Sequence, residues 1–364
     1  MTEQAKATVN VFEQMAEYGH EQVIFNYDKA TGLKAIIAIH DTTLGPALGG
    51  CRMWDYETEQ AALTDALRLS RGMTYKCAVS GASHGGGKTV ILGDPKTEKS
   101  DELFQALGTF IETLKGRYYT GTDVGTVGMD FVSASKQTKC VVGLPEEYGG
   151  SGNSAIITAY GAYQGIKATA KEAFGTDSLG DLTIAIQGLG KVGYDLAGRL
   201  YQDGVKLIVT DIAEENVRRA KETYPNITTV TPEEIFGVKC DIFSPNALGA
   251  IINDETIPIL QCKAICGAAN NQLEELRHGE MLKEKGILFA PDYVANAGGL
   301  IQVADELKGY NKERAFKNAG LIYGILLDIF AIAKKENIAT SLAADIMLDR
   351  KIEKIGQIER KYTR

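Results

Sequence analysis

Three charged residues in the first third of the chain have types and surroundings that suit acid–base chemistry. Lys88 follows three glycines in HGGGKTVILGDP, Lys76 ends the segment RGMTYK, and Asp123 lies in TGTDVGT. Two lysines that share one site lower each other's pKa, and burial lowers a lysine pKa further. One lysine would stay charged and hold a substrate carboxylate, while the other would be neutral and act as a general base. Two surface lysines and a structural aspartate are the alternative that these residues alone leave open.

The glycines before Lys88 do not form a nucleotide-binding P-loop. That motif needs a glycine five residues before Gly87, and Ala82 stands there. Residues 89–92 are apolar and partly β-branched and are followed by Gly-Asp-Pro, so they predict a strand and a turn, whereas a P-loop lysine opens a helix. We expect the glycines to remove side-chain bulk, so that a substrate approaches the backbone near Lys88.

A second motif predicts a dinucleotide-binding turn. Residues 182–187 have a strand pattern, GLGKVG follows at 188–193, and a helix pattern covers 194–202. Gly188 would make the tight turn, Gly190 would admit a pyrophosphate to the helix N-terminus, and Gly193 would let helix and strand pack closely. The cofactor-binding residues expected here are Gly188, Leu189, Gly190, Lys191, Val192 and Gly193.

The next strand pattern ends at Asp211, 23 residues after Gly188. An acid at this place accepts hydrogen bonds from the adenosine ribose hydroxyls and repels a 2′-phosphate, so the motif predicts NAD in preference to NADP. An ordinary βαβ turn with a solvated aspartate is the alternative.

Composition and charge exclude several classes of protein. The net charge of −8 argues against a nucleic-acid partner. No apolar run approaches the roughly 20 residues of a membrane helix, and the N-terminus lacks the apolar region of a secretory signal, so we expect no membrane partner and a cytoplasmic location. The six cysteines are scattered. Only Cys262 and Cys266 lie close together, and no second pair completes a metal site.

Alternating strand and helix patterns predict an α/β fold, and 364 residues favour two domains. The first domain (1–150) has a strand pattern at 35–39 and helix patterns at 60–70 and 102–114, the first of which is expected to end at Gly72 to Lys76. The glycine-rich EEYGGSGNSA marks the boundary. The second domain (151–330) has a long helix pattern at 154–174 and strand patterns at 183–186, 206–209, 241–243 and 264–266. Residues 331–364 are expected to form helices that return to the first domain.

Several segments in order carry a specific resemblance to a known family. They are GPALGGCRMW, RGMTYK, GGGKTVILGDP, TGTDVGT, the NAD turn, GAANNQL and APDYVANAGGLIQVADEL. From about Glu21 to past Tyr310 the chain resembles the glutamate/leucine/phenylalanine/valine dehydrogenases, and within them the branch that acts on apolar amino acids. The resemblance implies an N-terminal α/β substrate domain and a Rossmann-type NAD domain separated by a cleft. It also implies a homo-oligomer and the reversible oxidative deamination of an L-amino acid to a 2-oxo acid and ammonia.

The resemblance also implies roles for individual residues. Lys76 matches the lysine that binds the substrate carboxylate, and Lys88 matches the catalytic lysine of low pKa that activates water at the imino carbon. Asp123 matches the acid that exchanges protons with the substrate amino group. Gly49 matches a backbone contact to the substrate, and Thr158 matches the residue that holds the nicotinamide amide.

The remaining site residues follow from the same resemblance. Asn271 and Asn296 match residues that line the junction of cofactor and substrate. The expected substrate pocket contains Leu48, Met73, Gly121, Leu300 and Val303. Gly121 and Leu300 match the phenylalanine enzymes, since leucine enzymes tend to carry Ala and Val there. SGNSAIITAYG and the threonine after Lys88 match the leucine enzymes. We expect L-phenylalanine as the substrate, with leucine-type aliphatics as the alternative.

Two residues depart from the family pattern, and two rival functions stay open. His84 replaces an apolar residue and is expected to be a partly exposed loop histidine, with an effect on the substrate pocket or the pH profile, or a catalytic role, as the alternatives. Asn246 replaces the cysteine of a Pro-Cys-Ala stretch. A different NAD-dependent dehydrogenase, such as one for hydroxy acids, would use a histidine as proton carrier, and none of the four histidines lies in a motif. An NAD-binding regulator would need neither lysine nor Asp123.

Overall fold

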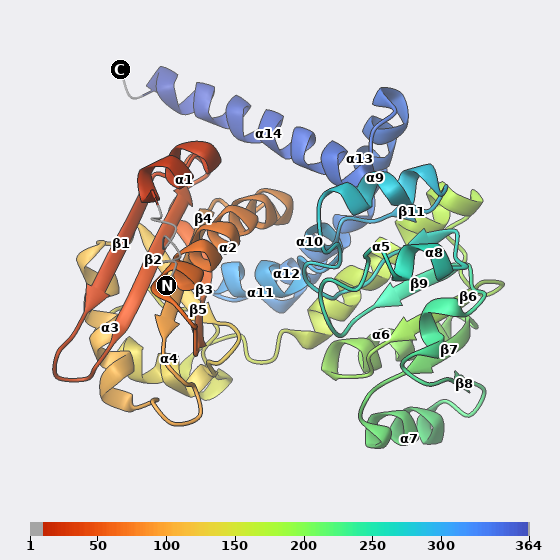
Figure 1. Ribbon diagram of the computed structural model, residues 1–364, viewed down its shortest axis with the longest axis horizontal. Coiled ribbons are helices and arrows are strands. Elements are labelled where there is room, and N and C mark those ends of the chain that lie inside the picture. Colours follow the sequence, from red (N-terminus) through yellow and green to blue (C-terminus); the bar gives the residue numbers. More distant parts are fainter. Residues whose placement is uncertain (1–9, 363–364) are drawn as a thin grey trace, which may run out of the picture. The chain divides into compact units, whose positions relative to one another are not determined.

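The computed structural model describes residues 10–362 and divides into two compact units (Figure 1). The described residues of the first unit run to Ala78, continue over Ala82–Gly152, and resume at Ile355. The second unit comprises Val79–Gly81 and Asn153–Lys354. The chain therefore changes unit inside the glycine-rich segment EEYGGSGNSA. The two-domain α/β architecture expected from the sequence is confirmed.

A five-stranded sheet lies at the centre of the first unit, in the order β1-β2-β4-β3-β5. β2 is antiparallel to β1 and β4, and β3 is parallel to β4 and β5. The strand expected at 35–39 is confirmed, but the strand expected at 89–92 begins earlier and contains Lys88 itself. The bounds are β1 Gln22–Tyr27, β2 Lys34–Asp41, β3 Ala47–Trp54, β4 Gly85–Leu92 and β5 Tyr118–Thr122.

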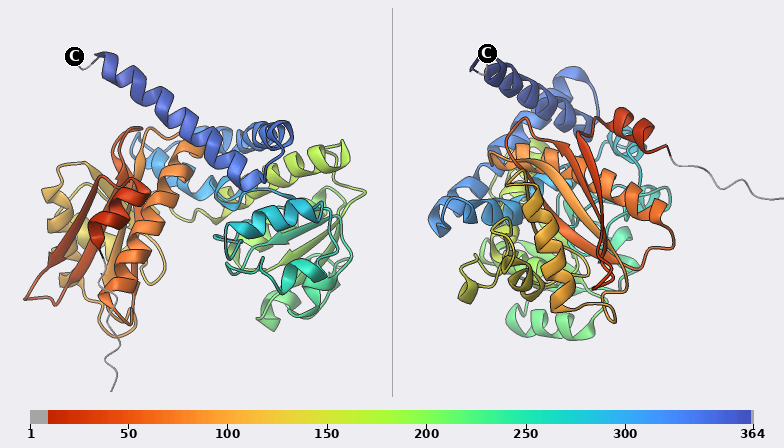
Figure 2. Two further views of the ribbon diagram at one scale, coloured as in Figure 1. Left: turned by 45° about the horizontal axis from the view of Figure 1, so that its top comes forward. Right: turned by 90° about the vertical axis from the view of Figure 1, so that its left-hand side faces the viewer.

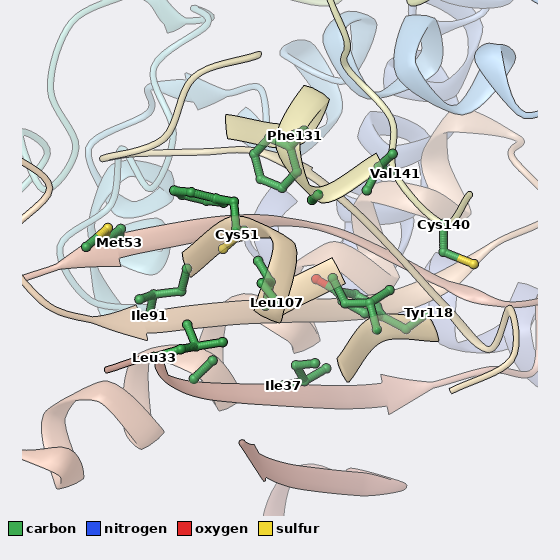
Figure 3. Close-up of a cluster of buried hydrophobic side chains, with 14 of the residues drawn as sticks. Leu33, Ile37, Cys51, Met53, Ile91, Leu107, Tyr118, Phe131, Cys140 and Val141 are labelled. Carbon is green, nitrogen blue, oxygen red and sulfur yellow. The ribbon is translucent and has the colours of Figure 1, made fainter. Parts of the chain in front are cut away.

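Helices cover both faces of this sheet (Figure 2). Successive strand residues point to opposite faces. Ile36 therefore joins Leu67 of α2 in one apolar cluster. Ile37 joins Leu107 of α3 and Phe131 of α4 in the other, as Figure 3 shows. The helices of this unit are α1 Val11–Tyr18, α2 Glu59–Ser80, α3 Asp101–Thr113 and α4 Gly128–Ser135, and a 3-10 turn follows at Glu146–Tyr148.

Helix α2 is longer than the sequence indicated. We expected it to end between Gly72 and Lys76, but it continues to Ser80. Gly72 does not stop the helix, and the last turn buries Cys77, Ala78 and Val79. Burial of this apolar turn stabilises helix that a local pattern does not reveal.

The second unit contains a fully parallel six-stranded sheet in the order β11-β10-β9-β6-β7-β8. Numbered from its own first strand, this is the 3-2-1-4-5-6 order of a Rossmann sheet, whose ligands bind where the order reverses, here between β6 and β9. Four strands were predicted, and the two-residue β8 and β11 were not. The bounds are β6 Thr183–Gln187, β7 Lys206–Thr210, β8 Thr228–Thr229, β9 Ile242–Pro245, β10 Ala264–Ile265 and β11 Leu288–Phe289.

Helix α5 is the centre of a helical layer in the second unit. Gly161 and Gly165 of α5 let Ile322 and Leu326 of α13 approach closely, since a Cβ at either glycine would lie 2.8 or 3.3 Å from their methyl groups. The helices are α5 Ala155–Phe174, α6 Lys191–Gln202, α7 Glu214–Thr223, α8 Thr256–Ile259, α9 Arg277–Glu284, α10 Asp292–Ala295, α11 Gly298–Glu306, α12 Lys312–Gly320 and α13 Ile322–Glu336, with a 3-10 turn at Glu234–Gly237.

The C-terminal residues divide between the units. Helix α14 is Thr340–Tyr362, and only its part from Ile355 belongs to the first unit. Residues 331–354, which we expected on the first domain, belong to the second unit. Helix α13 packs on α5. The start of α14 is bound to the second unit, since Oγ1 of Thr340 donates to the carbonyl of Phe289 and the hydroxyl of Tyr293 donates to Asp345. The segment Lys312–Glu336 is long and apolar enough to cross a membrane by length and composition alone. One third (33%) of its apolar stretch is buried, and Leu326, Ile329 and Phe330 are among the buried residues of α13.

Candidate active site

Lys88 and Asp123 meet within the first unit. Lys88 is only 3% exposed, and its Nζ donates to Oδ2 of Asp123. Lys88 lies on β4 and Asp123 directly follows β5, so the contact spans the intervening strand β3. Gly50 of β3 permits this approach, since a Cβ there would lie 3.0 Å from the Cβ of Asp123 and 2.6 Å from the carbonyl oxygen of Thr122.

The turn after β5 fixes the position of Asp123. The backbone N–H of Asp123 donates to Oγ1 of Thr126 at 2.9 Å, and this hydroxyl donates to the carbonyl of Cys51 on β3 at 2.8 Å. Gly125 has a φ of +80°, and a Cβ there would lie 1.9 Å from the carbonyl oxygen of Met53. The residues of TGTDVGT therefore bind the turn to β3 and direct the carboxylate at Lys88.

The surroundings of Lys88 favour its neutral form. Burial lowers the pKa of Lys88 to about 7, and the positive charges of Arg52 and Lys76 act in the same direction. The carboxylate of Asp123 favours the charged form and opposes this shift. Lys88 is thus poised to take up or release a proton near neutral pH, with a carboxylate in direct contact as its proton partner.

Lys76 and Met73 lie on one face of α2, three residues apart. Both are partly exposed. A Cβ at Gly49 would lie 3.3 Å from Cγ of Met73 and 1.7 Å from the carbonyl oxygen of Gly87, so only glycine fits there. The carbonyl of Gly49 already accepts from the hydroxyl of Tyr118 at 2.9 Å. A contact between Gly49 and the substrate stays a prediction.

The glycines before Lys88 do not open space for a substrate, contrary to our expectation. A Cβ at Gly86 would lie 2.1 Å from Oγ1 of Thr74, and one at Gly87 would lie 2.7 Å from the ring of Tyr118. The protein itself fills both positions. The missing side chain at Gly86 lets α2, which carries Lys76, lie directly on β4, which carries Lys88, and the missing side chain at Gly87 makes room for Tyr118 of β5.

His84 also differs from the expectation. It was expected to be a partly exposed loop histidine, but it is buried at 6% exposure directly before β4. Its ring meets that of Tyr119 edge-on, with 6.3 Å between the ring centroids. Packing against an aromatic neighbour explains its burial, and this contact joins residues too far apart for the local sequence to reveal.

The other residues of the first unit that were expected to line the substrate pocket lie on β3 and β5. Leu48 is 1% exposed, and Gly121 is buried. A Cβ at Gly121 would lie 2.7 Å from the carbonyl oxygen and 3.1 Å from Cγ2 of Val142. The volume that glycine leaves at position 121 is therefore occupied by Val142.

Sequence reasoning gave no role to Arg52 or Asp65, although both lie at the site. Nη1 of Arg52 donates to Oδ2 of Asp65 at 2.8 Å, and Nη2 lies 3.6 Å from Oδ1 of Asp123. The sequence feature that could have indicated a role was the position of Arg52 within the family-like segment GPALGGCRMW. Its partner on α2 is thirteen residues away, and no local pattern joins the two.

The turn between β6 and α6 fits a pyrophosphate. Gly188 has a φ of +93°, and a Cβ there would lie 2.8 Å from Cβ of Ala247. A Cβ at Gly193 would lie 2.0 Å from the carbonyl oxygen of Gly188, whereas nothing lies within 4 Å of the same position at Gly190. The N-terminus of α6 is therefore open at Gly190, where backbone N–H groups attract an anion. Of the other motif residues, Leu189 is buried, Lys191 exposed and Val192 partly buried.

Asp211 is bound to this turn. Its Oδ2 accepts from the backbone N–H of Leu189 at 2.6 Å, and its Oδ1 accepts from that of Ala213 at 2.8 Å. Each carboxylate oxygen has a further lone pair for a hydroxyl donor. Asp211 thus sits at the end of β7 with acceptor capacity left for a ribose.

Thr158 and the start of α11 lie together in the second unit. Oγ1 of Thr158 donates to the carbonyl of Ser154 at 2.8 Å, and a Cβ at Gly299 would lie 2.8 Å from that hydroxyl oxygen. Leu300 and Val303 are partly exposed and lie on one face of α11. This arrangement groups three of the expected site residues of the second unit.

Four asparagines lie in or beside the loops at the strand ends. Asn296 is 3% exposed, and its Nδ2 donates to Oδ1 of Asn270 at 2.8 Å, while its Oδ1 has no partner among the described residues. Asn271 is exposed in a left-handed conformation with φ of +51°. Oδ1 of Asn246 accepts from the N–H of Ala268 at 2.9 Å, so this departure from the family pattern ties β9 to the loop after β10.

Comparisons with known proteins cover almost the whole chain. A family model described as Glu/Leu/Phe/Val dehydrogenase, dimerisation domain, matches residues 20–142, and one described as Glutamate/Leucine/Phenylalanine/Valine dehydrogenase matches residues 207–319. The chain is 56% identical to a leucine dehydrogenase of Geobacillus stearothermophilus, over 95% of this chain and 94% of the relative. It is 53% identical to a phenylalanine dehydrogenase of Caldalkalibacillus thermarum, with the same coverage. The crystal structure of an L-tryptophan dehydrogenase from Nostoc punctiforme is 46% identical, with a TM-score of 0.86, over 95% of this chain and 99% of that one.

Proposed function

The chain belongs to the glutamate/leucine/phenylalanine/valine dehydrogenase family, and we propose that this amino acid dehydrogenase catalyses the reversible, NAD-dependent oxidative deamination of an apolar L-amino acid. The observation that carries the proposal is the buried Lys88 in contact with Asp123. A lysine whose pKa is about 7 serves as a general base at neutral pH.

Three charged residues of the first unit, Lys76, Asp123 and Lys88, take part in this reaction. Lys76 holds the substrate carboxylate by a charge-assisted hydrogen bond. Asp123 takes a proton from the substrate ammonium group. NAD, which the β6–α6 turn and Asp211 would hold, would supply the acceptor for the hydride from Cα, and the substrate would become an iminium ion. Lys88 would remove a proton from water as the water oxygen bonds to the iminium carbon, and Asp123 would return its proton to the nitrogen. As the C–N bond breaks and ammonia leaves, the freed Asp123 carboxylate would take the hydroxyl proton, which gives the 2-oxo acid.

The second unit supports NAD as the cofactor. The open N-terminus of α6 at Gly190 suits the pyrophosphate, and the carboxylate of Asp211 suits the ribose hydroxyls. The same carboxylate would repel the 2′-phosphate of NADP. Thr158, Asn271 and Asn296 are proposed to hold the nicotinamide end, and the unpartnered Oδ1 of Asn296 is an acceptor for an amide N–H.

We propose L-phenylalanine as the preferred substrate and leucine-type aliphatics as the alternative. Leu300 offers a longer apolar wall than the valine that leucine enzymes tend to carry. Gly121 gives weaker support, because Val142 occupies the volume that the glycine leaves. The leucine alternative is supported by 56% identity to a leucine dehydrogenase, against 53% to a phenylalanine dehydrogenase. One methylene in such a pocket changes discrimination by only about 1–3 kcal/mol, so both substrates are expected to turn over.

We also propose a cytoplasmic homo-oligomer. The first matching family model is described as a dimerisation domain. Within that region the edge strand β1 exposes Phe25 at 61% and Tyr27 at 63%, and exposed apolar side chains on a strand edge are typical of a pairing surface. All six cysteines are free, and five of them are buried, which suits a reducing compartment.

The test is NADH oxidation by the wild-type protein with phenylpyruvate or 4-methyl-2-oxopentanoate, with and without ammonium. We expect turnover that depends strictly on ammonium. Turnover without ammonium would indicate a hydroxy-acid dehydrogenase. NADH binding without turnover on any keto acid would indicate a regulator. Either result overturns the proposed function.

A further inference from the structure

Arg52 joins two carboxylates of the first unit. It lies on β3 between Asp65 of α2 and Asp123 after β5. Its Nη1 donates to Oδ2 of Asp65 at 2.8 Å, and its Nη2 lies 3.6 Å from Oδ1 of Asp123. The side chains of all three are at most 21% exposed, so water screens these interactions less than those of a surface pair. The guanidinium therefore connects α2 to the acid that contacts Lys88.

Asp65 is a firm anchor for this guanidinium. Its Oδ2 also accepts from the hydroxyl of Tyr56 at 2.6 Å, and its Oδ1 accepts from Nη2 of Arg68 at 3.3 Å. The two short bonds to Oδ2, from Arg52 and Tyr56, hold the carboxylate in one orientation, and the longer bond from the exposed Arg68 adds little. Arg68 is 67% exposed and makes no hydrogen bond or ion pair with Asp123 among the described residues, so of the two arginines on Asp65 only Arg52 reaches the acid that contacts Lys88.

Arg52 and Lys88 use different oxygens of Asp123. Lys88 donates to Oδ2, whereas Oδ1 faces Arg52 and accepts from the backbone N–H of Val124. A carboxylate held at Oδ1 from two directions cannot rotate freely, so its other oxygen stays directed at Lys88. We propose that Arg52 is a positioning residue, anchored by Asp65, that keeps the Asp123 carboxylate oriented toward Lys88. This inference rests on the proposed function, in which Asp123 and Lys88 move protons.

The same network adjusts the proton affinity of Lys88 with opposite signs. The charge of Arg52 lowers the pKa of Lys88, and the charge of Asp65 raises it. Loss of the Arg52 charge should therefore move the titration of Lys88 to higher pH, and loss of the Asp65 charge should move it to lower pH. Simple disruption of the fold would not shift the pKa of Lys88 in opposite directions in the two variants.

Four variants test the inference through pH profiles of kcat for deamination. Arg52→Met removes the positive charge, and it should lower kcat about tenfold. It should also move the acid limb, the part of the profile where kcat falls at low pH, to higher pH by about one unit. Asp65→Asn removes the negative charge and weakens the anchor, so kcat should fall while the limb moves down. Arg52→Lys keeps the charge but loses the two-pronged geometry, so the limb should stay while kcat falls. Arg68→Met is the matched control, since it also loses a bond to Asp65, and it should leave kcat and the limb unchanged.

Two measurements separate this inference from the proposed function. Trp54, the single tryptophan, lines the same open pocket as Arg52 and Asp65, so an unchanged emission spectrum shows that the pocket is intact in a variant. Acetylation of Lys88 by acetic anhydride at a series of pH values, read by mass spectrometry, follows its titration without turnover. Lys88 titrations that shift in opposite directions in Arg52→Met and Asp65→Asn support the inference. A wild type that lacks ammonium-dependent activity would refute the proposed function and leave this inference standing. Equal titrations, or equal loss of kcat in Arg68→Met and Arg52→Met, overturn the inference.

Discussion

Nζ of Lys88 donates to a carboxylate oxygen of Asp123, although the two residues are 35 positions apart and lie on opposite sides of strand β3. The lysine is almost completely buried, and a buried charge is retained only when it is paired. The pair is therefore stable in two forms, as ammonium with carboxylate or as neutral amine with a proton elsewhere. This property makes it suitable for moving protons during deamination.

The pH dependence of deamination should follow Lys88. Its pKa is lowered from 10.5 to about 7, first by burial and then by the charge of Arg52. The base must be neutral, and the neutral fraction rises as pH increases through the pKa. We therefore expect kcat for oxidative deamination to fall as pH decreases below about 7. A profile that stays flat down to pH values well below 7 would contradict this role.

Lys76→Ala should damage substrate affinity most. Loss of a charge-assisted hydrogen bond costs about 1.5–3 kcal/mol, which corresponds to an increase of roughly tenfold or more in KM. Lys76→Arg should restore part of the affinity because it keeps the charge. Lys96→Ala, which alters an exposed lysine of the same unit, is the control. An unchanged KM for the amino acid in Lys76→Ala would show that another group holds the carboxylate.

Cofactor preference should depend on Asp211. The wild type should prefer NAD strongly, and Asp211→Ala should narrow the ratio of kcat/KM for NAD over NADP. The KM for NAD should also rise, because the bonds from Leu189 and Ala213 to the carboxylate are lost. Asp181→Ala, at an exposed aspartate before β6, should change neither value. Equal use of both cofactors by the wild type would refute the ribose role.

Substrate preference should respond to Leu300. Leu300→Val should raise kcat/KM for leucine relative to phenylalanine by about tenfold, since one methylene is worth about 1–3 kcal/mol. Gly121→Ala should act in the same direction but also lower the melting temperature, because its methyl group meets the carbonyl of Val142 at 2.7 Å. Leu276→Val, at an exposed leucine before α9, is the control. A wild type that already prefers leucine, or an unchanged ratio in both variants, would mean that these positions do not set specificity.

Local sequence predicted the second unit better than the first. The turn from Gly188 to Gly193 works through adjacent residues, so its strand, glycines and helix could be recognised together, and Asp211 follows at a characteristic distance. In the first unit, glycines occur for a different reason. Gly86 and Gly87 are required by Thr74 and Tyr118, which belong to other elements, and a local pattern does not indicate which atoms a missing side chain would meet.

The contacts of Arg52 were not predictable for the same reason. Its fork reaches Asp65 only after α2 has packed on the sheet, and it reaches Asp123 only after β3 and β5 have paired. The exposure of His84 was predicted wrongly. A polar residue beside glycines indicated an exposed loop, yet packing against Tyr119 buries it. Residue types and order therefore pointed to Lys88 and Asp123, which the fold brings into contact, whereas the groups that orient them are visible only in the fold.

The most direct test of the central claim is the kcat of Lys88→Ala for oxidative deamination, measured together with the affinity for NADH by fluorescence titration. General-base catalysis typically contributes a factor of about 100 to 10,000, so kcat should fall by at least about 100-fold. NADH affinity should be unchanged, because the proposed cofactor residues lie in the second unit. Near-normal turnover in a folded Lys88→Ala protein would contradict the assignment of Lys88 as the catalytic base.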